Sequence, residues 1–276
     1  MVNVTIHAAH NIEWQGRYAH HAKAGLLRHG INARVIWNST PQTQADVSII
    51  MGPNMYKAIE RSGIPYLMFN RKLIGNDPQT VHENCAVGWD GFNGRATFCV
   101  KEIDPNRLLR YINLDEIEEW KDGGQHILLC EQSDVGRSTE FKSISDFYTH
   151  AHNDSYATNQ TILFRKKPVG EAQVKPALVK AGFKNSKAVA VLNSTISVEA
   201  LMAGYPVISY DKGDPVYSIT GHSMAEIVYP ETRLDLFQYM AHCQWTQAEI
   251  ANGDFWHQLY PKQGIQLHEW TSNANL

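Results

Sequence analysis

The sequence predicts an α/β protein made of two halves, each with a mostly parallel β-sheet. Short apolar runs of strand length alternate with segments of helical spacing in both parts of the 276-residue chain. Strands that alternate with helices in this way indicate βαβ units. The polar segment 115–124, which ends in Lys-Asp-Gly-Gly, lies between the two series and has the composition of a linker. We therefore expect one domain at residues 1–118 and a second at residues 125–276.

The first half contains four segments that predict strands. They are Val2–Ala8, Ala33–Trp37, Val47–Met51 and Tyr66–Phe69, with helices expected at Tyr18–His29 and Met55–Ser62. Gly30 and Gly63 follow the helices, where glycine commonly ends a helix. Ligands of such sheets bind beyond the carboxyl ends of the strands. The candidate rim therefore comprises the loops His10–Trp14, Gly52–Asn54 and Asn70–Lys72, with Trp14 as a candidate substrate contact.

The second half repeats the pattern. Its expected strands are Ile127–Cys130, Thr161–Phe164, Val189–Leu192 and Val207–Tyr210, and its expected helices are Ile196–Ala203, Arg233–Cys243 and Thr246–Leu259. The chain thus predicts two Rossmann-like domains that face each other across a cleft, with C-terminal helices packing back. A cleft between two such halves suits a nucleotide-containing ligand.

A candidate phosphate site lies where the third strand of the second half meets its helix. Asn193, Ser194 and Thr195 occupy the helix start, where free N–H groups and a partial positive charge favour anions. Glu199 lies one turn further on, within reach of a hydroxyl-bearing group beside the phosphate. The same residues also suit the ordinary cap of a helix in any α/β domain.

A run of cations follows another strand. Arg165, Lys166 and Lys167 precede Pro168, and cations at this edge of a sheet suit a diphosphate, which Arg can bind through two parallel hydrogen bonds. The alternative is a solvated charge cluster, the more common role of such runs.

Two further loops follow strand ends. Gln132, Ser133 and Arg137 lie in a polar loop that could contact a sugar or a phosphate. Asp211 and Asp214 flank Lys-Gly after the last strand. Their carboxylates could accept hydrogen bonds from sugar hydroxyls, or they could form a simple turn.

An unusual loop is expected at Val87–Ala96. It contains three glycines together with Trp89, Asp90, Phe92, Asn93 and Arg95. Glycine at this density indicates backbone bending or close approach to another group. The loop is a candidate substrate rim, although the two aromatic residues could instead fill the edge of a core.

Asp90 is the candidate general base. A carboxylate among aromatic residues and glycines is expected to be partly desolvated, which raises its pKa toward the working range. The alternative bases are His10, His20 and His21.

Several classes of protein are disfavoured. The formal net charge of −3 argues against a strongly basic nucleic-acid coat, and four scattered cysteines do not form a disulfide framework. The sequence has no Walker A loop, no G-x-G-x-x-G after the first strand, no G-x-S-x-G and no zinc-site spacing. It also has no D-x-D motif, so we expect a metal-independent protein. No membrane segment or signal peptide is evident, and we expect a soluble cytoplasmic protein.

The order of motifs resembles that of GT-B-fold glycosyltransferases, specifically the compact kind encoded by tailed bacteriophages. G-W-D-G-F-N-G-R-A is similar to a "GWNGLNGR" loop of that group, and R-K-K-P stands where the family tends to have R-x-H-P. The segments concerned are Gly88–Ala96, Cys130–Asp134, Arg165–Pro168, Asn193–Val207 and Gln244–Gly253. Two residues depart from the family pattern: Lys167 replaces its histidine and Asp90 replaces its asparagine.

The resemblance implies a nucleotide diphosphate sugar as the donor, taken to be a UDP-sugar, with no further cofactor. Arg165, Lys167, Ser194 and Thr195 would neutralise the leaving diphosphate, and Glu199 would bind the ribose. The acceptor would lie on the first half, near Trp14, Trp89, Asp90, Asn93 and Arg95. Phage members of the family are linked to glycosylation of hydroxymethylated pyrimidines in DNA, which would place the protein in the host cytoplasm.

A DNA acceptor is consistent with a group of basic residues in the first half. They are Arg17, Lys23, Arg28, Arg34, Lys57, Arg61, Arg71, Lys72 and Arg95. If the target base is flipped out of the duplex, Trp89 and Phe92 would suit stacking. Two alternatives remain open: a transferase with a cell-surface glycan or lipid-linked acceptor, and a non-catalytic module that binds a nucleotide sugar or nucleic acid.

Overall fold

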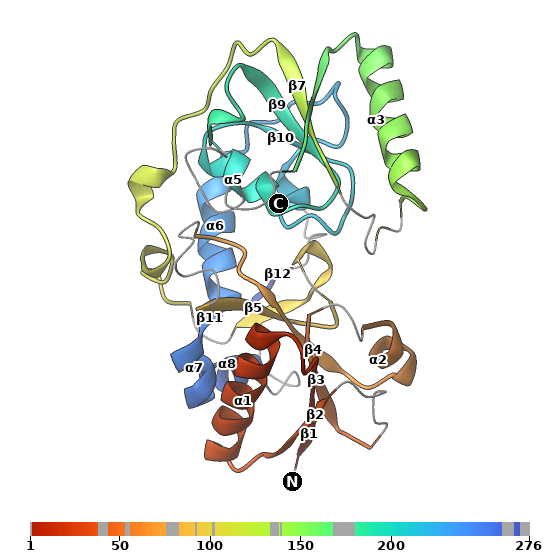
Figure 1. Ribbon diagram of the computed structural model, residues 1–276. Coiled ribbons are helices and arrows are strands. Elements are labelled where there is room, and N and C mark those ends of the chain that lie inside the picture. The colour runs from red at the N-terminus through yellow and green to blue at the C-terminus, as the bar shows by residue number, and fades with distance from the viewer. Residues whose placement is uncertain are drawn as a thin grey trace.

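The structure is a computed structural model in which two sheets lie one above the other (Figure 1). It describes residues 2–37, 44–52, 56–75, 83–91, 93–100, 103–132, 138, 140–167, 180–260 and 268–270. Among these residues, no helix combines the length and the apolar character needed to cross a membrane.

The first sheet has six strands in the order β11-β5-β4-β3-β1-β2. Their bounds are Asn3–Ala8 for β1, Asn32–Trp37 for β2, Val47–Met51 for β3, Tyr66–Arg71 for β4, Asn84–Trp89 for β5 and Gln244–Thr246 for β11. The first four are mutually parallel, whereas β5 runs antiparallel to β4 and β11 runs antiparallel to β5.

Two helices cover the faces of this sheet. On one face, alternate residues of β1 such as Ile6 share a buried cluster with Tyr18 and Leu26 of helix α1 (Glu13–Arg28). On the other face, Ile50 of β3 packs with Ile59 of helix α2 (Tyr56–Ser62). Because α1 begins at Glu13, Trp14 lies in its first turn and not in the expected loop.

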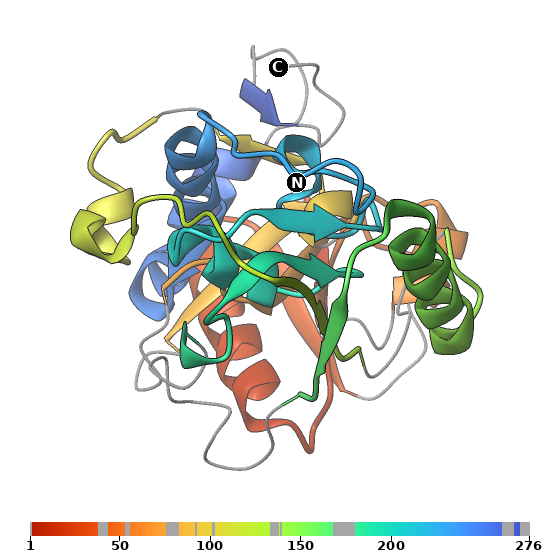
Figure 2. The same ribbon diagram turned by 90° about the horizontal axis from the view of Figure 1, so that it is seen from above.

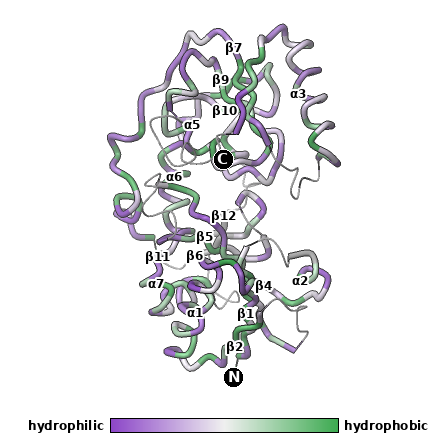
Figure 3. Tube along the Cα trace, viewed as in Figure 1, coloured by the Kyte–Doolittle hydropathy of each residue, from purple (hydrophilic) through white to green (hydrophobic). Residues whose placement is uncertain are grey.

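The second sheet has four parallel strands in the order β10-β9-β7-β8. Their bounds are His126–Cys130 for β7, Ile162–Arg165 for β8, Ser186–Val191 for β9 and Val207–Ser209 for β10. The central strands of both sheets are largely hydrophobic (Figure 3), as strands covered on both faces must be.

The helices of the second half divide between the two faces of its sheet (Figure 2). Helix α3 (Ile144–Thr158) packs against one face through Phe147 and Ala151. Helices α5 (Ile196–Met202) and α6 (Arg233–His242) pack against the other. The predicted α/β class with Rossmann-like parallel sheets is therefore confirmed.

The chain passes between the two halves twice. The outgoing connection, residues 103–124, carries the short 3₁₀ helices η4 (Leu108–Arg110) and η5 (Leu114–Glu116). The return connection, residues 242–244, joins α6 to β11. After it, helices α7 (Gln247–Asn252) and α8 (Asp254–Leu259) join the cluster of α1 on the first sheet through Ile250 and Phe255. The C-terminal helices thus pack on the first half.

Three smaller elements complete the described chain. Strands β6 (Phe98–Val100) and β12 (His268–Trp270) form an antiparallel pair. The 3₁₀ helix η3 (Asn93–Arg95) follows β5, and η7 (Tyr217–Ile219) follows β10.

Two expectations about local structure are wrong. Residues 87–89 belong to β5 and not to a loop, because Val87 and Trp89 are fully buried and pair with Phe69 and Leu67 of β4. The single helix expected at Thr246–Leu259 is divided at Gly253, whose φ of 89° is incompatible with a continuous helix.

Gly204 provides a test of how tightly the outgoing connection packs on α5. Its φ is 78°, and a Cβ there would lie 2.0 Å from the carbonyl oxygen of Glu119. Gly204→Ala should therefore lower the free energy of unfolding by about 3 kcal/mol. Gly30→Ala is the matched control, because Gly30 has a φ of 71° with nothing within 4 Å; it should cost about 1 kcal/mol. Equal losses in urea unfolding would contradict the assigned contact.

Candidate functional site

The candidate site lies at the carboxyl edge of the second sheet. From β7 the chain crosses to β8 on one side and then to β9 on the other, which makes the β7/β9 boundary a topological switch point of the kind that binds ligands. Gln132 follows β7, Arg165 ends β8 and Asn193–Thr195 follow β9. The structure therefore brings these predicted residues to one edge. Ser133, Arg137 and Phe92 lie outside the described residues.

Glu199 and two cations form the centre of this edge. Burial raises the pKa of Glu199 to about 7, and the positive charges of Arg165 and Lys72 oppose that rise. Arg165 comes from the second half and Lys72 follows β4 of the first half, so both halves contribute charge to one place. A carboxylate flanked by two cations can hold a ligand that carries both hydroxyl and anionic groups.

Arg165 is held in place by its neighbours. Its guanidinium lies 5.4 Å from the ring centroid of buried Phe183 and hydrogen-bonds the thiol of Cys130, whose own pKa is raised by burial to about 11. Stacking on an aromatic ring orients the planar guanidinium. The alternative expectation, a solvated charge cluster, therefore fits Lys166 and Lys167, which are exposed. It fits Arg165 less well.

The loops after β7 and β8 are tied to each other. The backbone N–H of Glu131 donates to the carbonyl of Arg165 at 2.8 Å, and the N–H of Lys167 donates to the Glu131 carboxylate at 2.6 Å. The N–H of Gln132 donates to the Tyr148 hydroxyl at 2.9 Å. Lys167 thus has a carboxylate beside its backbone, which reduces the net positive charge there.

The start of α5 corrects one expectation. The N–H of Ser194, expected to be free for a phosphate, donates to the Asp214 carboxylate at 3.0 Å. The Ser197 hydroxyl donates to the same carboxylate at 2.8 Å, and Thr195 makes no side-chain capping bond. An anion of the chain itself therefore occupies the expected phosphate position at Ser194. Burial raises the pKa of Asp214 to about 7.

Asp211 and Arg95 join the two halves. Nη2 of Arg95 lies 2.5 Å from Oδ1 of Asp211, which is fully buried. The other oxygen of Asp211 accepts a hydrogen bond from the Ser138 hydroxyl, and the N–H of Gly94 donates to the carbonyl of Gly213 at 3.2 Å. Both residues were expected to contact substrate, but the structure uses them to fix η3 of the first half against the loop after β10.

Two expectations within the Gly88–Ala96 segment are wrong. Trp89 is 1% exposed and its indole N–H donates to the carbonyl of Leu259 at 3.1 Å. It therefore fills the core, as the alternative interpretation had it, and does not form a stacking surface. Asp90 is exposed and not desolvated. It has a φ of 54°, and its carboxylate accepts the N–H of Tyr66 at 3.2 Å.

Trp14 and Asn93 are half-buried near the carboxyl edge of the first sheet. Trp14 lies edge-on to Tyr18, with a ring-centroid distance of 6.2 Å, and close to Gly52 after β3. Asn93, with a φ of 51°, accepts a hydrogen bond at 3.5 Å through its side-chain oxygen from the amide of Asn70 near the end of β4. The first half therefore also presents predicted residues at its carboxyl edge.

The sequence predicted no donor-site role for Lys72, which it placed among the basic residues suited to a DNA acceptor. It predicted none for Gln244 either, a buried residue whose side chain binds the segment after Lys72. Lys72 directly follows a predicted strand, and this position placed it in the candidate rim. Gln244 carried no such signal, because its contacts join residues about 170 positions apart.

A cavity of about 490 Å³ lies elsewhere, between α1, α7, α8 and the outgoing connection. Its lining includes Asp104, Arg107, Arg110 and Glu249, and it shares no residue with the edge that carries Glu199. In the parts of the chain that the structure describes, no group of three or more histidine, cysteine or carboxylate side chains is arranged to hold a metal ion.

Comparisons with known proteins give structural similarities only. No family model and no curated protein matches the sequence. The β-Kdo 2,7 transferase and β-Kdo 2,4 transferase of Thermosulfurimonas dismutans KpsC are similar in structure, with 13% and 12% identity and TM-scores of 0.47 and 0.48. The alignments cover 90% and 85% of this chain and 98% and 89% of those chains.

A third similar structure is the UDP-GlcNAc 2-epimerase of Methanocaldococcus jannaschii in complex with UDP-GlcNAc and UDP. It has 9% identity and a TM-score of 0.32, over 92% of this chain and 98% of that chain. At these identities and TM-scores the similarities carry no argument about activity. The fold and the site themselves define an α/β protein with two Rossmann-like sheets and a charged carboxyl edge on the second.

The pKa of Glu199 makes stability depend on pH. Its ordinary value of 4.5 rises to about 7 in the folded protein, so between these values the folded chain holds a proton that the unfolded chain has lost. Stability therefore falls as the pH rises through this window. The Glu199→Gln variant has no titratable group at this position. The free energy of unfolding of the variant minus that of the parent should therefore increase by about 1 kcal/mol from pH 5 to pH 8.

Urea unfolding at several pH values measures this difference. Glu60→Gln is the control, because Glu60 is exposed on α2 of the other half. A Glu199→Gln difference that stays constant over the whole range would show that Glu199 does not titrate near neutral pH.

Proposed function

We propose that the protein is a glycosyltransferase that takes a sugar from a nucleotide diphosphate sugar, with a UDP-sugar as the first candidate donor. The observation that carries the proposal is the convergence of Arg165 and Lys72 on half-buried Glu199 at the topological switch point of the second sheet. Cations beside a hydrogen-bonding carboxylate match a diphosphate next to a ribose. In this proposal the second half binds the donor and the first half binds the acceptor.

Transfer of a sugar leaves negative charge on the departing diphosphate. The positive charges of Arg165 and Lys72, together with exposed Lys167, would stabilise that charge as it develops. The carboxylate of Glu199 would accept hydrogen bonds from ribose hydroxyls. The N–H of Ser194 can take part only if Asp214, which now accepts it, releases it.

For the acceptor, we propose a hydroxymethylated pyrimidine base in DNA. The support is the resemblance of Gly88–Ala96 to the loop of phage glycosyltransferases, together with exposed Arg34, Arg61 and Arg71 on the first half. Arg95 does not add to this surface because it pairs with Asp211. Asp90 would act as the base toward the acceptor hydroxyl from an exposed position, which a large acceptor such as DNA can reach.

Arg165→Met tests the donor site. Loss of a charge-assisted contact to a diphosphate should weaken UDP binding about 10- to 100-fold, measured by isothermal titration calorimetry. Lys166→Met is the matched control: Lys166 is the adjacent cation, but it is exposed, so binding should stay within about twofold. Equal losses in the two variants would show that UDP responds only to overall charge and not to this site.

Transfer itself is tested with a panel of nucleotide sugars and DNA that contains hydroxymethylcytosine or hydroxymethyluracil. Mass analysis of the digested nucleosides should show a hexose added to the modified base and none added to unmodified DNA. Asp90→Asn should lower the rate about 100-fold or more while UDP binding persists. Donor hydrolysis with transfer only to glycan or lipid-linked acceptors would replace the DNA proposal by the alternative acceptor class.

A further inference from the structure

Gln244 is a fully buried polar residue of the first sheet whose side chain holds the segment after β4. Its Oε1 accepts the backbone N–H groups of Leu73 and Ile74 at 2.8 and 3.1 Å. Its Nε2 donates to the carbonyl of Ile74 at 3.0 Å. The side-chain amide of Gln244 thus provides hydrogen-bond partners for three backbone groups that lie outside the sheet pairing. It thereby fixes the path of residues 72–75.

That segment belongs spatially to the second half. Leu73 and Ile74 are buried in the same cluster as Leu128 of β7, Val191 of β9 and Val198 of α5. Gly75 lies against the outgoing connection, where a Cβ would come within 2.9 Å of the carbonyl oxygen of Tyr111. The residue before this anchor is Lys72, whose charge acts on Glu199.

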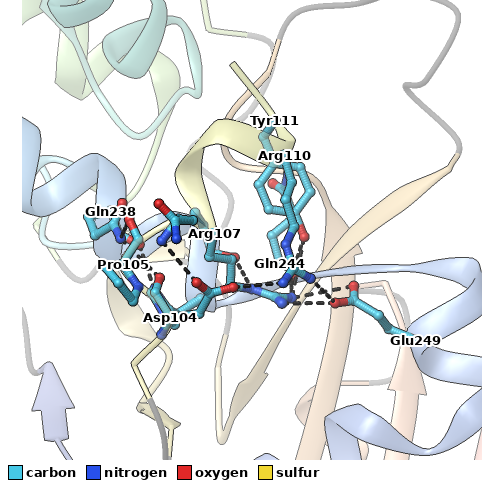
Figure 4. A network of polar contacts seen from close by, with 11 residues as sticks. Asp104, Pro105, Arg107, Arg110, Tyr111, Gln238, Gln244 and Glu249 are labelled. Atoms are coloured by element: carbon cyan, nitrogen blue, oxygen red, sulfur yellow. Dashed lines mark hydrogen bonds and ion pairs between the residues drawn. The ribbon is translucent and has the colours of Figure 1, made fainter. Parts of the chain in front are cut away.

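Gln244 is itself fixed where the two connections meet (Figure 4). Its backbone carbonyl accepts from Nη2 of Arg107 at 2.5 Å and from the Tyr111 hydroxyl at 2.8 Å. Arg107 also donates to the carbonyl of Ala241 and to Glu249, both at 2.8 Å. The support of Gln244 therefore comes from the outgoing connection, whose Arg107 is in turn held by residues of α6 and α7.

We propose that Gln244 is a positioning residue for the donor site, which acts by holding residues 72–75 so that Lys72 faces Glu199 and Arg165 from the opposite half. This proposal names the sugar donor as the ligand, and in that respect it rests on the function proposed above. The placement of Lys72 by Gln244 does not depend on that function. The side-chain bonds of Gln244 go to the backbone of Leu73 and Ile74 and not to Lys72, Glu199 or Arg165, so its effect passes through that backbone.

An amide is suited to this task, because it accepts two hydrogen bonds and donates one in a single plane. Gln244→Met preserves the length and volume of the side chain but leaves the N–H groups of Leu73 and Ile74 without acceptors, which favours movement of the segment toward water. Gln244→Asn keeps the amide but shortens its reach, and serves as a second variant if the first does not fold.

The experiment measures the pKa of Glu199 in the free protein by NMR with ¹³C-labelled glutamate, with the resonance assigned by its loss in Glu199→Gln. Lys72→Met should raise this pKa, because a favourable positive charge is removed. Gln244→Met should raise it in the same direction. The double variant should match Lys72→Met alone, since two changes that act through one charge are not additive. UDP affinity should fall about 10-fold in each single variant.

Gln238→Met is the control. Gln238 joins α6 to the outgoing connection, donating to the carbonyls of Asp104 and Pro105 at 3.1 and 2.7 Å. These side-chain bonds lie away from residues 72–75, so Gln238→Met should leave the pKa of Glu199 unchanged. An unchanged pKa in Gln244→Met, additive effects in the double variant, or an equal rise in Gln238→Met would overturn the proposal. If the parent protein binds no UDP, the proposed function fails, and the NMR comparison still decides the role of Gln244.

Discussion

The buried guanidinium of Arg107 is the interaction on which the joining of the two halves depends. It donates to carbonyls of both α6 and β11 and pairs with Glu249, and it lies 4.6 Å from the ring centroid of Trp245. Removing an arginine from water costs several kcal/mol unless its donors are satisfied, and here they meet acceptors in α6, β11 and α7. Loss of Arg107 would remove the nearest cation from Glu249 and one hydrogen bond from each of two carbonyls. Breaking a buried ion pair by removing one partner typically costs about 3–5 kcal/mol. The outgoing connection is thereby fixed to the return connection at one point.

This junction explains how a site can draw on both halves. Gln244, whose carbonyl Arg107 and Tyr111 hold, extends the junction to residues 72–75, and these enter the core of the second half. A second contact between the halves, Arg95 with Asp211, joins η3 to the loop after β10. Two separated contacts restrict relative rotation more than one does. The charges around Glu199 are therefore pre-organised, which lowers the cost of ordering them when a ligand binds.

The sequence predicted what depends on local pattern. Apolar runs marked all four parallel strands of each half, and Gly204 marked the end of α5, because strand and helix periodicity and cap chemistry are read from neighbouring residues. It did not predict β11 or the role of Gln244, since three residues that pair at a sheet edge have no periodicity and their partners are distant. Trp89 was misjudged for a related reason: glycines on both sides suggested a loop, but pairing with β4 overrode that preference. Asp211 and Asp214 were singled out as carboxylates that follow the last strand, but their partners, Arg95 and Ser194, could only be seen in three dimensions.

The charge balance at the carboxyl edge of the second sheet follows from burial. Asp211 is neutralised by Arg95, whereas Asp214 and Glu199 lie where burial raises each pKa to about 7. Near neutral pH these two acids are therefore partly protonated, and the edge is less negative than its composition indicates. An anion bound between Arg165 and Lys72 would raise both pKa values further, because like charges disfavour the ionised form. Binding of an anion at this edge is consequently linked to proton uptake, and its affinity should decline as the pH rises above 7.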